Sequence, residues 1–233
     1  MPGFDNYLYE DILRPNMNDA AYFILLYEWL EDKVISVVKD CYSGFCMLEG
    51  KGYCNIDEAY IQALQKKIDK GETGDIVPYA VSLNGAKRAK AKYEKEVIQP
   101  IKKKDAKTLR GSLLWLQKHE AITPKEKSRI LRIRKRRNVI VHELLRILGD
   151  GLDEDDAKMI VEMIELIRKI NQWNLMEIET PILGYTLPEG ASPEDVHGGD
   201  DIVLTGMLHI LFLGEGERYK RILEQVKNNE TPV

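Results

Sequence analysis

The sequence predicts an all-α protein: a helical bundle of about six to eight helices, with a long Pro/Gly-containing loop near the C-terminus. Apolar residues recur at the three- and four-residue spacing of an amphipathic helix over most of the chain. Residues that favour helix ends separate these segments. At 233 residues the chain can bury one good core without requiring a second domain. We therefore expect a single helical domain over 1–233, with a core at about 18–173 and residues 174–233 as an extension.

Composition and cysteine content indicate a cytoplasmic protein. Hydrophobic residues make up 44% of the chain and charged residues 31%, and no run approaches the ~18 apolar residues of a membrane span, so no membrane association is expected. The N-terminus lacks the basic and apolar regions of a signal peptide. Cys41, Cys46 and Cys54 are odd in number and close together, which favours a reducing compartment. We expect small buried side chains rather than a zinc site, since zinc needs four ligands and no histidine lies nearby.

The first helix is predicted to begin at Asn18 or Asp19 and to end near Tyr42. Before it we expect an irregular segment, because Pro15 and Asn16 disfavour a helix. Residues 43–53 contain glycines and predict a turn. The apolar residues that share one helical face are Phe23, Leu26, Leu30, Val34, Val37 and Cys41.

A second helix is expected after the segment Asn55–Glu58, which resembles a capping box, and Gly71 should end it. Residues 71–84 are a connection of uncertain shape, in which residues 76–83 form a short strand or a buried loop. A third helix should start near Asn84 and run to about Gln99.

Pro100 then interrupts or kinks the chain. Asp105 is the expected cap of the next helix, which should end near His119. After the central basic helix, residues 153–156 place acids at the positive end of a further helix. Its expected core face consists of Ile160, Val161, Ile164, Ile167 and Ile170.

Residues 174–200 contain several prolines and glycines, which predict a long loop. Loops of this length usually carry function, form an interface or move. Residues 202–213 are strongly apolar and predict a buried helix rather than a strand. A short closing helix is expected at 217–227.

The stretch Arg129–Leu148 is the most informative part of the chain. Thr123 to Glu126 supplies an N-cap hydroxyl, a first-turn proline and a glutamate, while Gly149 and Gly151 would close the far end. Arg137 lies at the centre of the apolar stripe, where its charge is costly without a partner, an anion or water. The stripe itself contains Ile130, Ile133, Ile140, Val141, Leu144 and Leu148.

Basic charge is concentrated in two segments of a chain whose net charge is −4. Residues 125–146 hold nine basic residues against two acids, and residues 87–110 hold ten against three. This distribution indicates a local polyanion site rather than a generally basic surface. For residues 87–110, lysines that merely solvate helix faces are an equally acceptable interpretation.

The segment Arg137-Asn-Val-Ile-Val-His142 resembles the Arg-X(4–6)-His motif of the HEPN superfamily. In that superfamily the residue after the arginine is commonly asparagine, aspartate or histidine, and here it is Asn138. The resemblance is specific over about six residues and only topological over residues 23–170. Residues beyond Trp173 match no family that we can name.

The resemblance implies a helical bundle that forms a homodimer, with two copies of the motif facing each other across a cleft. Many HEPN proteins are metal-independent endoribonucleases, among them toxins of toxin–antitoxin pairs, abortive-infection proteins and CRISPR-associated nucleases in antiviral defence. We accordingly expect an endoribonuclease with no cofactor and no metal. Its expected partners are RNA, such as tRNA or mRNA, a second copy of itself, and an antitoxin or regulatory protein.

The residue types suit this chemistry. Attack of a ribose 2′-hydroxyl on its own phosphate needs proton movement and stabilisation of an anionic phosphorane. His142 can serve as general base or acid, and Arg137 can stabilise the developing charge. Asn138, on the face of His142, could orient the imidazole or bind ribose or phosphate. The flanking residues expected to hold the RNA backbone are Arg132, Arg134, Lys135 and Arg136.

Two other interpretations stay open. In the first, Arg137 pairs with an acid of another helix and His142 is a structural hydrogen-bonding residue, because Arg-X4-His is common on helices. In the second, the chain is a non-catalytic HEPN-like module that binds RNA, a nucleotide or a partner protein. The sequence does not identify an RNA target.

Overall fold

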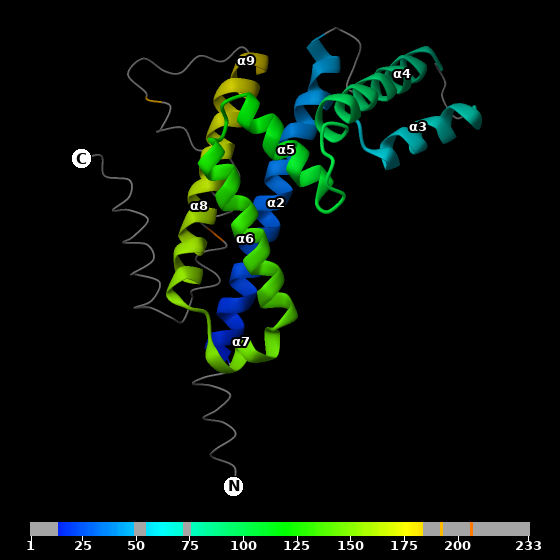
Figure 1. Cartoon of the computed structure of the whole chain (residues 1–233). Helices are drawn as coiled ribbons and strands as arrows, with labels where there is room; N and C mark the ends of the chain where they lie inside the picture. Colours follow the sequence, from blue (N-terminus) through cyan, green and yellow to red (C-terminus); the bar gives the residue numbers. More distant parts are fainter. Residues whose placement is uncertain (1–13, 49–54, 72–75, 184–191, 193–205, 207–233) are drawn as a thin grey trace. The chain divides into compact units, whose positions relative to one another are not determined.

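The computed structural model describes residues 14–48, 55–71, 76–183, 192 and 206 (Figure 1). Within these residues all secondary structure is helical, which confirms the predicted all-α class and the predicted range of helix number. None of the described helices combines the length and apolar character needed to cross a membrane.

The chain divides into two compact units. Unit 1 comprises residues 1–30, 124–175 and 187–233, and unit 2 comprises residues 31–123 and 176–186. The single domain expected over 1–233 stays a prediction.

Helix α2 (Arg14–Leu48) is longer than predicted at both ends. It begins before Asn18 because Pro15 lies in its first turn, where a proline costs no backbone hydrogen bond. It also continues past Tyr42, so the predicted turn is wrong over residues 43–48. Ser43 is buried, and its hydroxyl accepts a hydrogen bond from the backbone N–H of Ile56 at 3.4 Å. This packing keeps the chain helical where its glycine content alone predicted a turn.

Cys41, on the same helix, is a buried free thiol, as predicted. Burial raises its pKa to about 12, so it is inert as a nucleophile. The side chain of Cys46 and the whole of Cys54 lie outside the described residues.

In unit 2, helix α3 (Glu58–Asp69) ends before Gly71, whose φ of +65° favours glycine, as expected. The predicted capping box is not formed. Asp57 occupies the N-cap position, and the Asn55 side chain instead accepts a hydrogen bond from the Asp57 N–H at 2.8 Å. An asparagine two residues before the N-cap therefore closes a local turn here.

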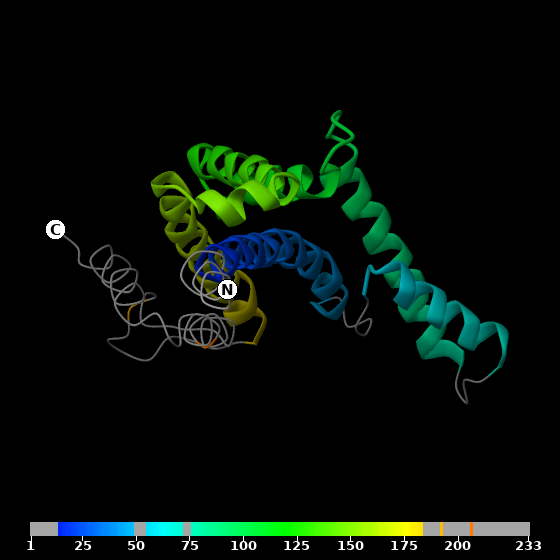
Figure 2. The ribbon, with the colours of Figure 1, turned by 90° about the horizontal axis from the view of Figure 1, so that it is seen from below.

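Helix α4 (Ile76–Tyr93) and the π-helix η2 (Glu94–Ile98) follow, so the strand or loop predicted for residues 76–83 is wrong. A short apolar run does not by itself distinguish the two structures. Here Leu83 and Ala86 pack on Ile61 and Leu64 of α3, which lies alongside α4 (Figures 1 and 2). The helical segment ends before Pro100, as predicted.

Helix α5 (Lys107–Lys118) ends at His119 as expected, but Asp105 does not cap it. The N-cap residue is Ala106, in a left-handed conformation with φ +46°. The Asp105 carboxylate instead accepts a hydrogen bond from Arg110 at 3.3 Å. Farther along α5, Gly111 packs directly against the backbone of η2, where a Cβ would lie 2.2 Å from the Val97 carbonyl oxygen.

Gly111→Ala is expected to lower the free energy of unfolding by about 1–3 kcal/mol. The added methyl group meets backbone rather than a flexible side chain, so α5 and η2 must separate despite the better helix propensity of alanine. Urea unfolding followed by circular dichroism measures the change. Gly149→Ala is the control, because nothing lies within 4 Å of a Cβ at that position. Equal stability of the two variants would contradict the close contact.

Unit 1 contains α6 (Pro124–His142), α7 (Leu144–Asp150) and α8 (Glu154–Asn174). Helix α6 starts at Pro124 as predicted, but the single helix expected through Leu148 is wrong. The chain bends at Glu143, with φ −110° and ψ +27°, and α7 begins at the next residue. Nothing in the local sequence predicts this bend. It makes His142 the last residue of α6.

Helix α8 has the predicted acidic start, with a capping box between Asp153 and Asp156. Its predicted core face is buried except for Val161, which is half-buried. The predicted long loop is wrong over residues 174–183: Asn174 ends α8, and residues 175–183 form η3 (Leu175–Glu179) and α9 (Thr180–Leu183). Apart from residue 192, the rest of that loop lies outside the described residues, and so do the predicted helices at 202–213 (residue 206 apart) and 217–227.

Candidate functional site

The motif residues lie at the C-terminal end of α6. His142 is its last residue and is exposed, while Asn138, one turn earlier, is half-buried. The Arg137 side chain is 28% exposed and lies beside the fully buried Ile133 and Ile140. The predicted position of a cation within an apolar stripe is therefore correct.

Arg137 is held by contacts with α2. Its Nη2 donates to the carboxylate of Glu28, and its guanidinium lies 5.7 Å from the ring centre of Tyr27. Its Nη1 donates to the Asn138 side-chain oxygen at 3.3 Å. Its Nε is buried and has no hydrogen-bond partner among the described residues. These contacts explain how a permanent charge is tolerated between isoleucines.

Glu28 is a site residue that the sequence analysis missed. It is 109 positions from Arg137 in the chain, and its carboxylate side chain is 49% exposed. A pair this exposed contributes little to stability. Its chemical effect is larger, because a phosphate that binds Arg137 must share the guanidinium with Glu28 or displace it.

His142 forms no hydrogen bond or ion pair in the described part of the chain. The side-chain oxygen of Asn138 faces Arg137, so Asn138 does not orient the imidazole in this structure. The imidazole is thus open to solvent and to a ligand. The site brings Arg137 and Asn138 together and leaves His142 exposed near them.

The four flanking basic residues differ in their surroundings. Arg132 pairs with Glu162 of α8 at 2.7 Å, and Arg136 with α8 acids. Arg134 is half-buried and is not free of contacts within the protein. Lys135 is exposed and has no partner within the described residues. Of the four, Lys135 is thus the most accessible to an RNA backbone.

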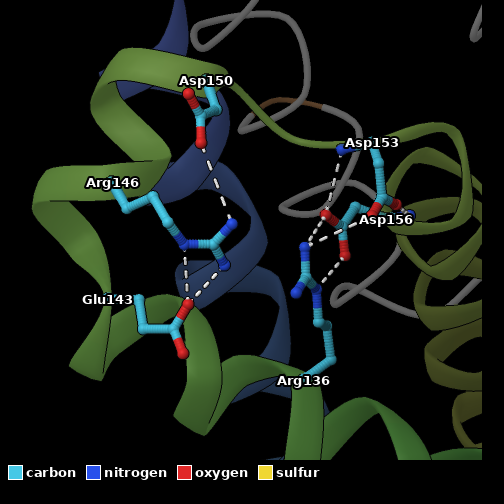
Figure 3. Close-up of polar contacts among 6 residues, drawn as sticks. All are labelled: Arg136, Glu143, Arg146, Asp150, Asp153 and Asp156. Atoms are coloured by element: carbon cyan, nitrogen blue, oxygen red, sulfur yellow. Dashed lines mark hydrogen bonds and ion pairs between the residues drawn. The ribbon is translucent and has the colours of Figure 1, made fainter.

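Arg136 is the most strongly held of these residues. Its Nε donates to Asp156 at 2.6 Å and its Nη2 to the same carboxylate at 2.5 Å, with Asp153 at 3.5 Å (Figure 3). The hydrogen bond to Asp156 raises the pKa of Arg136. Because Asp156 is fully buried, an RNA phosphate could bind the Arg136 guanidinium only by displacing Asp156 and disrupting the N-terminus of α8.

Exposed apolar side chains flank His142. Val141 and Leu144, which were predicted to belong to the buried stripe, are each 40% exposed, and Leu145 is 88% exposed. Val139 is also exposed. The bend at Glu143 explains the error for Leu144, since it interrupts the single helix on which the stripe was expected to continue; Val141 precedes the bend. Nearby, Arg146 lies between Glu143 and Asp150 (Figure 3).

Comparisons of the chain with protein-family models, curated proteins and solved structures found no match.

Proposed function

We propose that the chain is a metal-independent endoribonuclease of HEPN type, acting in the cytoplasm as a toxin or antiviral-defence effector. The observation that supports it best is the solvent-exposed His142 at the end of α6, next to an arginine and an asparagine that already contact each other. An imidazole and a guanidinium in this setting are the groups that RNA transesterification requires.

In the proposed reaction, a ribose 2′-oxygen attacks the adjacent phosphorus and loses its proton to a base. The 5′-oxygen leaves and takes up a proton, which yields a 2′,3′-cyclic phosphate and a 5′-hydroxyl. His142 supplies or accepts one of these protons. Arg137 stabilises the phosphorane through the guanidinium edge that it shares with Glu28, and Asn138 keeps that guanidinium in place.

A homodimer would complete the site, because one histidine cannot act as base and acid at once. The exposed Val141, Leu144 and Leu145 beside His142 support this part of the proposal. Apolar side chains clustered on a surface commonly mark an interface. Two copies joined there would bring their His142 side chains near each other.

Leu145→Lys is expected to convert the dimer to a monomer, because it places a charge at the most exposed apolar position of this surface. Light scattering over a range of concentrations measures the mass. Leu25→Lys is the control, since Leu25 is exposed on α2 of the same unit. A wild-type chain that is monomeric at high concentration and still cleaves RNA would contradict the dimer.

The nuclease itself is tested with purified chain, structured RNA and excess EDTA. Cleavage should persist in EDTA, and Arg137→Ala should lower its rate by about 10²–10³, the cost of losing a donor to a developing oxyanion. Arg129→Ala is the control, because Arg129 lies on the same helix and pairs only loosely, at 3.8 Å, with Glu162. Cleavage that requires a divalent ion, or that survives Arg137→Ala, would contradict the proposal.

The pairing of Arg137 with Glu28 favours a second candidate: a non-catalytic HEPN-like module that binds RNA, a nucleotide or a partner protein such as an antitoxin. A guanidinium already neutralised by a carboxylate is less available to a transition state. RNA binding that survives His142→Ala, without cleavage by wild type under any condition, would support this module.

A further inference from the structure

Unit 2 carries a second group of basic side chains, which we name the lysine surface: Lys102, Lys103, Lys104, Lys107 and Lys118. The first three lie in the non-helical segment between η2 and α5, and the other two lie on α5. All are exposed except Lys107, which is half-buried.

The lysine surface is not neutralised within the described part of the chain. None of its five lysines has an ion pair or hydrogen bond there, whereas Lys39 and Lys90 of the same unit pair with Asp57 and Glu58. The only acid in residues 101–118 is Asp105, and its carboxylate contacts Arg110. Like charges in neighbouring positions repel one another, so an anion would be bound favourably here.

Along α5 the lysine surface is elongated. At about 100° per residue, Lys107, Leu114 and Lys118 fall within about 40° of one another on α5 and span about 16 Å along its axis. Leu114 is 41% exposed between the two lysines. A compact anion would contact only part of such a track. A flexible chain of phosphates that also carries apolar faces fits this face of α5, and such a chain is single-stranded nucleic acid.

We propose that the lysine surface binds the sugar–phosphate backbone of single-stranded RNA. This assignment rests on the proposed ribonuclease function and adds to it, because it places substrate binding on unit 2 rather than on Arg132 and Arg136, whose guanidinium groups pair with α8. Lysines hold phosphates as point charges, so binding depends strongly on salt and little on sequence.

The test measures RNA binding apart from cleavage. The full chain carries His142→Ala, and the anisotropy of a fluorescein-labelled single-stranded RNA is followed from about 50 to 200 mM salt. The variant Lys102→Gln/Lys103→Gln/Lys104→Gln should bind about tenfold more weakly at the low-salt end. The slope of log affinity against log salt should fall by about 2, since each single-strand phosphate contact contributes about 0.7.

The matched control is Lys66→Gln/Lys67→Gln/Lys70→Gln, which removes the same charge from exposed positions near the end of α3 in the same unit. It should keep the wild-type slope. Equal slopes for the two triple variants would overturn the proposal. So would a chain that binds no RNA but binds vesicles of anionic phospholipid. Thermal melting by circular dichroism verifies that both variants are folded.

The two proposals fail differently. A chain that binds RNA through the lysine surface but never cleaves it loses the nuclease and keeps this inference. A chain that cleaves RNA in a His142-dependent way, with unchanged KM and salt slope in the Lys102–Lys104 variant, keeps the nuclease and loses this inference.

Discussion

Replacing His142 by alanine is expected to lower the rate of RNA cleavage by about 10²–10⁴, the usual contribution of a general acid or base. The free energy of unfolding should change by less than about 0.5 kcal/mol, as for other surface positions. The reason is structural: His142 is exposed, ends its helix, and forms no hydrogen bond or ion pair with the described residues. A loss of activity therefore reports chemistry rather than misfolding.

Single-turnover cleavage of a labelled RNA measures this effect, with urea unfolding of the same preparation beside it. His119→Ala is the control: this exposed histidine ends α5, stacks on Trp115 with ring centres 3.9 Å apart, and lies outside the motif. It should retain wild-type cleavage. If His142→Ala also cleaves at the wild-type rate, the imidazole has no catalytic role and the nuclease assignment is wrong.

Asp156→Ala is expected to lower the free energy of unfolding by about 3 kcal/mol, at the lower end of the range for breaking a buried ion pair. Asp156 is fully buried and accepts two hydrogen bonds from Arg136 and one from the Asp153 N–H (Figure 3). Its removal leaves Arg136, which is only 23% exposed, without its main partner. Asp153, at 3.5 Å, limits the loss.

Asp155→Ala is the control for this prediction, because Asp155 lies in the same helical turn but is exposed and, among the residues that the structure describes, pairs only with Lys158 at 3.1 Å. It should change stability by at most about 0.5 kcal/mol. A double variant, Arg136→Met/Asp156→Leu, should recover part of the loss, because it removes the unpaired charge. Equal stability of Asp155→Ala and Asp156→Ala would show that the buried pair is not what holds the start of α8.

Some features encoded within a few residues were predicted correctly, although the capping box at Asn55–Glu58 and the cap at Asp105 were not. The start of α6 at Pro124 follows the preference of proline for the first turn of a helix, and the acidic start of α8 follows the preference of carboxylates for a helix N-terminus. The end of α3 before Gly71 depends on the conformational freedom of one residue. The helical state of residues 76–83 was missed because a short apolar run is compatible with a strand, a loop or a helix.

The candidate site also has features that the sequence predicts and features that depend on packing. Periodicity located Arg137 in an apolar stripe and indicated that its charge needs a partner. It could not identify Glu28, since that choice depends on how α2 and α6 pack within unit 1. It could not show that Arg132 and Arg136 pair with α8, for the same reason. The bend at Glu143 has no signal in the local sequence, and it makes His142 the last residue of α6.

Helix α2 contacts the motif region at two levels. Asn16 donates to the Leu148 carbonyl at the end of α7, at 2.9 Å, and Glu28 pairs with Arg137. The two contacts are 12 residues apart, which is about 18 Å along a helix axis. The spacing of these two contacts therefore fixes the register of α2 against α6 and α7. A shift of α2 along its axis by one turn, about 5.4 Å, would break both contacts together. The position of the Arg137 guanidinium consequently depends in part on the contact between Asn16 and Leu148, where no reacting group lies.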